Sequence, residues 1–131
     1  MKKHGILNSE IAKVLADLGH TDQIVIGDAG LPVPDGVKKI DLSLQLHEPS
    51  FQKVLDILLK EMEVEKVILA EEIKDQNSGQ FQAVKERIEG VDIEFVTHEA
   101  FKKQTGQAKA VIRTGEATPY SNIILQSGVL F

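Results

Sequence analysis

Stretches with the apolar spacing of a helix alternate along this chain with short apolar runs of strand character, and this alternation limits the folds open to it. Apolar residues three and four apart predict helices, whereas short apolar runs bounded by Gly or Asp predict strands. We predict strands at 23–27, 39–41, 66–70, 92–96, 108–113 and 122–125. Such an alternation is typical of an α/β domain with a mostly parallel sheet flanked by helices.

Capping residues mark where the predicted helices begin and end. Asn8 or Ser9 can cap the first helix, and Gly19 ends it. The third helix covers 77–89 and stops at Gly90. The second and fourth helices begin at Ser50 and Thr97.

The length of the chain predicts one domain. Its 131 residues contain no repeat, linker or low-complexity segment. A domain of this size buries roughly two-thirds of its unfolded surface. Strand 66–70 is apolar on both faces, as in a sheet covered on both sides. We therefore expect a single domain over 1–131.

Charge and cysteine content exclude several classes of protein. With 15 basic and 20 acidic residues the net charge is −5, which repels phosphate backbones, so we expect no nucleic-acid partner. The chain has no cysteine, which excludes disulfides, thiolate zinc sites and a thiol nucleophile, and fits a reducing cytosol. It has neither a signal-peptide core nor a run of ~20 apolar residues. We expect a soluble cytoplasmic protein with no membrane partner.

The loop after the first predicted strand has the features of a binding site. The apolar run 24–26 is preceded by His20 and followed by Asp28, which opens a loop rich in Gly and Pro. In a parallel sheet, small molecules bind outside the carboxyl ends of the strands, so we expect Asp28 to contact a ligand. His20 lies on the turn that enters the strand, and a neighbouring element or subunit would have to bring it to Asp28.

Two other interpretations of these residues, a nucleotide site and a metal site, are weaker. The segment 27–30 has some likeness to a phosphate-binding turn, but the glycine fingerprint needs more glycines and an immediate helix, whereas Pro32 and Pro34 keep this loop extended. We therefore expect no nucleotide. The histidines lack the partners three or four residues away that helical metal sites use, so we expect no metal at His4, His20, His47 or His98.

Two further polar segments could complete a site with Asp28. His98 follows strand 92–96 at the same carboxyl edge, and the turn 118–122 brings the only tyrosine together with a hydroxyl and an amide, although an ordinary loop could have this composition. Imidazole exchanges protons near neutral pH, while Asp and Asn hold hydroxyl groups by directional hydrogen bonds. This set suits a neutral polyhydroxylated ligand. No activated serine or spaced carboxylate pair indicates hydrolysis.

Four segments, in order along the whole chain, resemble the ribose pyranase and fucose mutarotase family, and within it the branch that acts on ribose. They are 3–8, 19–22, 26–32 and 120–122. The resemblance implies a ribose pyranase-like α/β domain that interconverts the β-pyranose and β-furanose forms of D-ribose without metal or organic cofactor. It also implies a homodecamer of two stacked pentameric rings with active sites at subunit boundaries.

The resemblance also assigns roles to single residues. His20 matches the catalytic histidine of the family. The residues that match its sugar-binding positions are Asp28, His98, Tyr120, Ser121 and Asn122. Lys102, one helical turn from His98, could face the site or could be a solvated lysine.

The chemistry of ring opening agrees with these roles. Opening a pyranose requires a proton at the ring oxygen and the loss of one from the anomeric hydroxyl, and we predict that His20 is the acid. A non-catalytic ribose-binding accessory protein of sugar uptake would use the same polar residues. The sequence leaves that alternative open.

The chain ends in an apolar tail, residues 128–131. Leaving Val, Leu and Phe exposed forgoes roughly 1.5–3 kcal/mol each, so we expect the tail to be buried, either in its own domain or against a neighbour. The implied ring assembly favours the neighbour. Because the turn 120–122 lies only a few residues upstream, we expect an anchored tail also to fix the sugar-binding groups.

Overall fold

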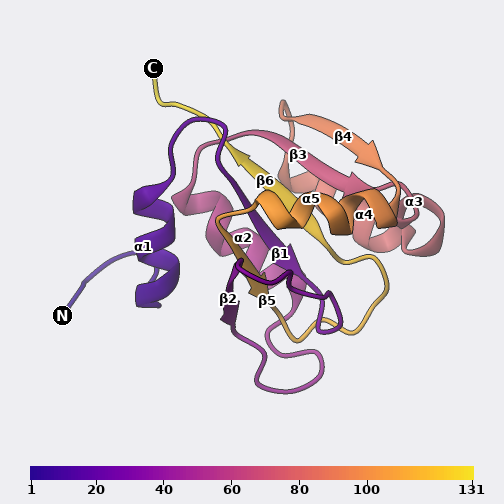
Figure 1. Cartoon of the computed structure of the whole chain (residues 1–131), viewed down its shortest axis with the longest axis horizontal. Coiled ribbons are helices and arrows are strands. Elements are labelled where there is room, and N and C mark those ends of the chain that lie inside the picture. Colours follow the sequence, from indigo (N-terminus) through magenta and orange to yellow (C-terminus); the bar gives the residue numbers. More distant parts are fainter.

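Five helices and six strands alternate in the computed structural model, which describes residues 1–131 (Figure 1). The helices are α1 (Ser9–Asp17), α2 (Phe51–Glu61), α3 (Ile73–Gln76), α4 (Ser78–Arg87) and α5 (His98–Gln104), with a 3-10 turn at Thr105–Gln107. The strands are β1 (Gln23–Gly27), β2 (Lys38–Asp41), β3 (Val64–Ala70), β4 (Asp92–Val96), β5 (Ala110–Arg113) and β6 (Ile123–Ser127).

The strands form one sheet in the order β2-β5-β1-β6-β3-β4. Only β6 runs antiparallel to its neighbours, β1 and β3; the other pairs are parallel. The predicted mostly parallel sheet is thus confirmed. Because of its direction, β6 begins at the edge where the other five strands end.

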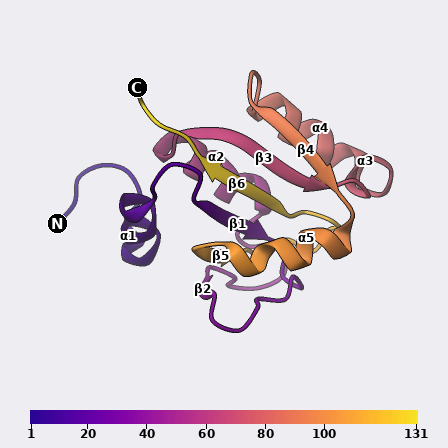
Figure 2. The ribbon, with the colours of Figure 1, turned by 45° about the horizontal axis from the view of Figure 1, so that its top comes forward.

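Helices cover both faces of the sheet. Alternate residues of β1 point to opposite faces: Ile24 and Ile26 pack in a core with residues of α1, α2 and α4, whereas Val25 packs in a second core with Phe101 of α5. Figure 2 shows α5 on the opposite side of the sheet from α2. None of the helices combines the length and apolar character needed to cross a membrane.

The predicted helix starts are confirmed by their caps. Each capping side chain accepts a hydrogen bond from a backbone N–H in the first turn, an interaction that typically contributes about 1 kcal/mol. The donor–acceptor distances are 3.0–3.4 Å, and the caps are Asn8, Ser50, Asn77 and Thr97.

Several predicted boundaries differ from the structure, and one helix was missed. The first helix is capped at Leu18, before Gly19, and α4 ends at Arg87. The short α3 was not predicted because its four residues are too few to show a helical period. Strand β6 extends to Ser127 but excludes Asn122, whose side chain bonds to the end of β1.

Candidate functional site

Asp28 directly follows β1 at the carboxyl edge of the sheet, as predicted. Its Oδ1 accepts a hydrogen bond of 2.9 Å from the N–H of Gly30, which turns the chain back toward the carboxylate. The guanidinium of Arg113 donates to the carbonyl of Ala29 over 3.0 Å. Gly27 lets the loop fold closely over the strand, because a Cβ there would lie 2.7 Å from Leu31 Cδ2. These contacts hold the carboxylate at the end of a buried strand.

Asn122, the residue just before β6, fixes the carboxylate of Asp28. Its Nδ2 donates to Asp28 Oδ2 over 3.1 Å, and its Oδ1 accepts from the Asp28 backbone N–H over 2.8 Å. Asn122 is only 1% exposed, and these two bonds use its amide oxygen and one of its N–H donors. In this chain it positions Asp28.

His98 is the first residue of α5 and reaches the same edge from the end of β4. Its backbone N–H donates to both carboxylate oxygens of Glu72, at 3.0 and 3.1 Å. Its ring lies edge-on to Tyr120, with centroids 5.1 Å apart, and stacks on Phe101 at 6.4 Å. Nδ1 is buried and makes no hydrogen bond, which leaves Nε2 as the nitrogen that can meet a ligand.

Ser121 is buried below the turn that carries Tyr120. Its hydroxyl accepts a hydrogen bond of 3.0 Å from Gln80 Nε2 and lies 2.8 Å from the hydroxyl of Thr118. The Ser121 side chain therefore faces the interior and holds the turn in place. Tyr120 itself has a positive φ of 56°, in the left-handed region.

A buried glutamate, Glu116, connects three segments at this edge of the sheet. Glu116 Oε1 accepts from the Phe51 N–H over 3.0 Å, and Oε2 accepts from the Thr118 hydroxyl over 2.9 Å. Its backbone carbonyl accepts from the N–H of Ala29, next to Asp28, over 2.9 Å. Glu116 thus links the start of α2, the turn 118–122 and the loop after β1.

A depression of about 530 Å³ opens beside Asp28. This volume falls within the range of small-molecule sites. Its lining includes Asp28, Gly30, Leu46, Arg113, Glu116 and Thr118.

His20 lies at the opposite edge of the sheet, on the exposed loop between α1 and β1. The five residues of β1 separate it from Asp28, which is about 17 Å at ~3.3 Å per residue. Its Nε2 lies 2.9 Å from Glu65 Oε2. One chain therefore brings together Asp28, His98 and the segment 120–122, but not His20.

Lys102 pairs with a neighbour on its own helix. Its Nζ lies 2.8 Å from Glu99 Oε1, and this hydrogen bond is the main reason that the pKa of Glu99 is lowered. The contact occupies the ammonium in this chain.

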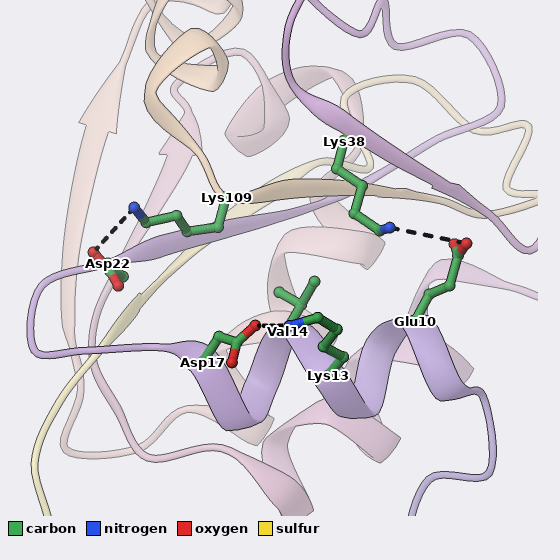
Figure 3. Close-up of a pocket in the computed structure, with 7 residues that line it drawn as sticks. All are labelled: Glu10, Lys13, Val14, Asp17, Asp22, Lys38 and Lys109. Carbon is green, nitrogen blue, oxygen red and sulfur yellow. Dashed lines mark hydrogen bonds and ion pairs between the residues drawn. The ribbon is translucent and has the colours of Figure 1, made fainter.

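A second pocket, of about 310 Å³, lies between α1 and the edge of the sheet where β1, β2 and β5 begin (Figure 3). Each of its three lysines faces a carboxylate. Lys13 lies 2.6 Å from Asp17, Lys38 lies 3.9 Å from Glu10, and Lys109 lies 3.9 Å from Asp22. These charges balance, so the pocket offers no net charge to an anion. No group of three or more His, Asp or Glu side chains in the chain is arranged to hold a metal ion.

Sequence reasoning missed the supporting residues Glu72, Gln80 and Glu116. A signal existed for Glu72, because it is a carboxylate two residues past the buried end of β3, whereas Asp28 directly follows β1. Gln80 and Glu116 carry no such signal. Their buried contacts join residues far apart in the chain.

Comparison with known proteins identifies relatives over the whole chain. Residues 1–130 match the RbsD / FucU transport protein family. Curated relatives named D-ribose pyranase from Bacillus licheniformis and Bacillus subtilis are 63% and 62% identical, covering all of both chains.

Solved structures agree with these matches. Bacillus subtilis RbsD complexed with D-ribose is 62% identical, with full coverage of both chains and a TM-score of 0.98. The fucose mutarotase of Streptococcus pneumoniae, in complex with L-fucose, is 25% identical over 95% of each chain, with a TM-score of 0.76. The chain belongs to the RbsD / FucU transport protein family.

Proposed function

We propose that this chain catalyses the interconversion of the β-pyranose and β-furanose forms of D-ribose. The observation that carries this proposal is the match to Bacillus subtilis RbsD, whose structure was solved with D-ribose bound. Full-length relatives named D-ribose pyranase support the same activity.

The carboxyl edge of the sheet supplies the sugar-binding half of the proposed site. Three groups can hold sugar hydroxyls by directional hydrogen bonds, namely the Asp28 carboxylate, Nε2 of His98 and the Tyr120 hydroxyl. Ser121 and Asn122 hold these groups in place through their buried bonds. All of these groups suit a neutral sugar and none requires a cofactor.

His20 supplies the proton in the proposed reaction. The anomeric hydroxyl loses a proton as the ring oxygen gains one, the bond between C1 and the ring oxygen breaks, and an aldehyde forms at C1. The C4 hydroxyl then attacks C1 and loses its proton while the carbonyl oxygen gains one, which closes the furanose. A positioned acid or base typically accelerates such steps by about 10²- to 10⁴-fold.

A neighbouring subunit completes the proposed site. Because β1 separates His20 from Asp28 within one chain, His20 of one subunit would act on ribose held at Asp28 of the next. A cytoplasmic homodecamer of two pentameric rings, which the family resemblance implies, would provide such boundaries.

The apolar tail supports an interface at the His20 end. Leu130 and Phe131 are 88% and 105% exposed, so the tail is not buried in its own domain. Our expectation that an anchored tail also fixes the sugar-binding groups does not hold within one chain, because β6 carries the chain from the turn 120–122 to the opposite edge of the sheet. There the carbonyl of Ser127 accepts from the N–H of Thr21, next to His20, over 2.9 Å.

Saturation-transfer NMR on an equilibrium mixture of ribose forms tests the function. Accelerated exchange between pyranose and furanose signals is expected for the enzyme. Line broadening with unaltered exchange would show instead a ribose-binding accessory protein, the alternative that uses the same side chains.

A further inference from the structure

The only side chain that contacts the His20 ring by a hydrogen bond is that of Glu65. The distance from His20 Nε2 to Glu65 Oε2 is 2.9 Å, although the two side chains are 53% and 35% exposed. Isolated surface pairs of this kind contribute little to stability. The geometry around Glu65 indicates a different role.

A β-bulge directs Glu65 toward His20. Along β3, Val64 pairs with Ser127 and Lys66 pairs with Gln126, so Glu65 is an extra residue with no partner of its own on β6. Bulges of this kind turn a side chain away from its regular direction. Figure 1 shows that β3 begins and β6 ends beside the loop between α1 and β1, and Glu65 contacts His20 of that loop.

A row of glutamines holds the other oxygen of the carboxylate. Gln126 Nε2 donates to Glu65 Oε1 over 2.7 Å, Gln23 Nε2 donates to Gln126 Oε1 over 2.9 Å, and Gln104 Nε2 lies 3.5 Å from Gln23 Oε1. Each amide in the row points its donor toward Glu65. The bond from Gln126 is the main reason that the pKa of Glu65 is lowered, followed by the bond from His20. Glu65 is therefore a carboxylate at neutral pH and can only accept.

We propose that Glu65 is a positioning residue that keeps the proton of His20 on Nε2 and presents Nδ1 to the sugar. A carboxylate that accepts from Nε2 requires that nitrogen to carry its hydrogen, whether the ring is neutral or protonated. Nδ1 is then the nitrogen that exchanges a proton with ribose. This inference rests on the proposed function in one respect, namely that His20 is the catalytic acid.

The tautomer can be measured without any activity assay. Solid-state NMR of protein labelled with ¹⁵N-histidine separates protonated from unprotonated ring nitrogens, and the His20 signals are those lost in the variant His20→Ala. In the unmodified chain, neutral His20 should carry its proton on Nε2. In Glu65→Gln, part or all of the population should move to the Nδ1 tautomer. An unchanged tautomer in Glu65→Gln would overturn the proposal.

Exchange kinetics give a second readout. Glu65→Gln should lower the maximal exchange rate roughly 10- to 100-fold with little change in KM, because the ring stays but loses its orientation. Glu63→Gln is the matched control, since it removes the same charge nearby from a side chain with no hydrogen bond to His20, and it should leave the rate unchanged. Equal rates in the two variants would overturn the proposal. If the unmodified chain accelerates no exchange, the proposed function fails, whereas the tautomer measurement still tests the contact.

Discussion

The two edges of the sheet differ in how completely one chain builds them. At the carboxyl edge, Asp28 is held by Asn122 and Gly30, and the buried side chains of Ser121 and Glu116 fix the surrounding turns. At the opposite edge, His20 is exposed, and the apolar tail beside it has no cover. In the proposed enzyme, one subunit would build the sugar-binding groups at its carboxyl edge, called here the prepared edge. It would leave His20 at the opposite edge, called here the open edge, to act at the site of a neighbour.

Removing the group at the open edge should have the largest effect. His20→Ala should lower pyranose–furanose exchange by about 10²- to 10⁴-fold, or ~3–5 kcal/mol of barrier, while ribose affinity changes much less. His4→Ala, which removes an exposed imidazole without a hydrogen bond, is the control. Wild-type exchange in His20→Ala would contradict the assignment.

The same variant can test whether the two edges belong to different subunits. At low ribose concentration, assemblies formed from a mixture of His20→Ala and Asp28→Asn chains should exchange ribose faster than the same two variants kept as separate assemblies, because some boundaries join an intact His20 to an intact Asp28. No gain in demonstrably mixed assemblies would mean that the site is not shared in this way.

Deletion of the apolar tail at the open edge should have the next largest effect. Deletion of residues 129–131 removes three apolar side chains that are each worth roughly 1.5–3 kcal/mol when buried. We expect smaller species in analytical ultracentrifugation together with reduced exchange. A folded and fully active monomer would refute the proposed interface.

A change at the prepared edge should mainly affect binding. In Asp28→Asn, the new amide must turn its NH₂ toward the N–H of Gly30 or the Nδ2 of Asn122, and both of these groups donate. We expect ribose affinity to fall about 10-fold, since a hydrogen bond from a sugar hydroxyl to a charged carboxylate contributes about 1.5–3 kcal/mol. Titration calorimetry measures this change, and Asp35→Asn, an exposed residue of the same loop, is the control. An unchanged dissociation constant would count against a sugar contact at Asp28.

The smallest effect concerns the support of the prepared edge at low pH. Hydrogen bonds from Ser43 and then Arg113 lower the pKa of Asp41 to about 2, and the same Arg113 holds the loop after β1. Because the folded pKa lies below the unfolded value near 3.9, this stabilisation is complete above about pH 4 and is lost as the pH falls toward 2. Asp41→Asn should therefore flatten the loss of stability between pH 4 and 2, measured by urea unfolding. Since the group is exposed, the difference should stay below about 1 kcal/mol, and an equally steep loss in the variant would contradict it.

Local patterns predicted most of the fold. Strands 23–27 and 92–96 were predicted with the observed bounds, and the capping residues marked the helix starts within a residue. A cap or an apolar period depends only on neighbours in the sequence. The short α3 was not predicted, because four residues are too few to show the apolar period of a helix.

The sequence by itself determined the α/β class and the placement of Asp28 and His98 at one edge, because parallel strands all end on the same side of a sheet. Only the tertiary structure decided the direction of β6, which separates the tail from the sugar-binding turn. It also decided the pairs Asp28 with Asn122 and His20 with Glu65. These contacts depend on strand pairing and on one bulge, which join residues far apart in the chain and leave no local pattern in the sequence.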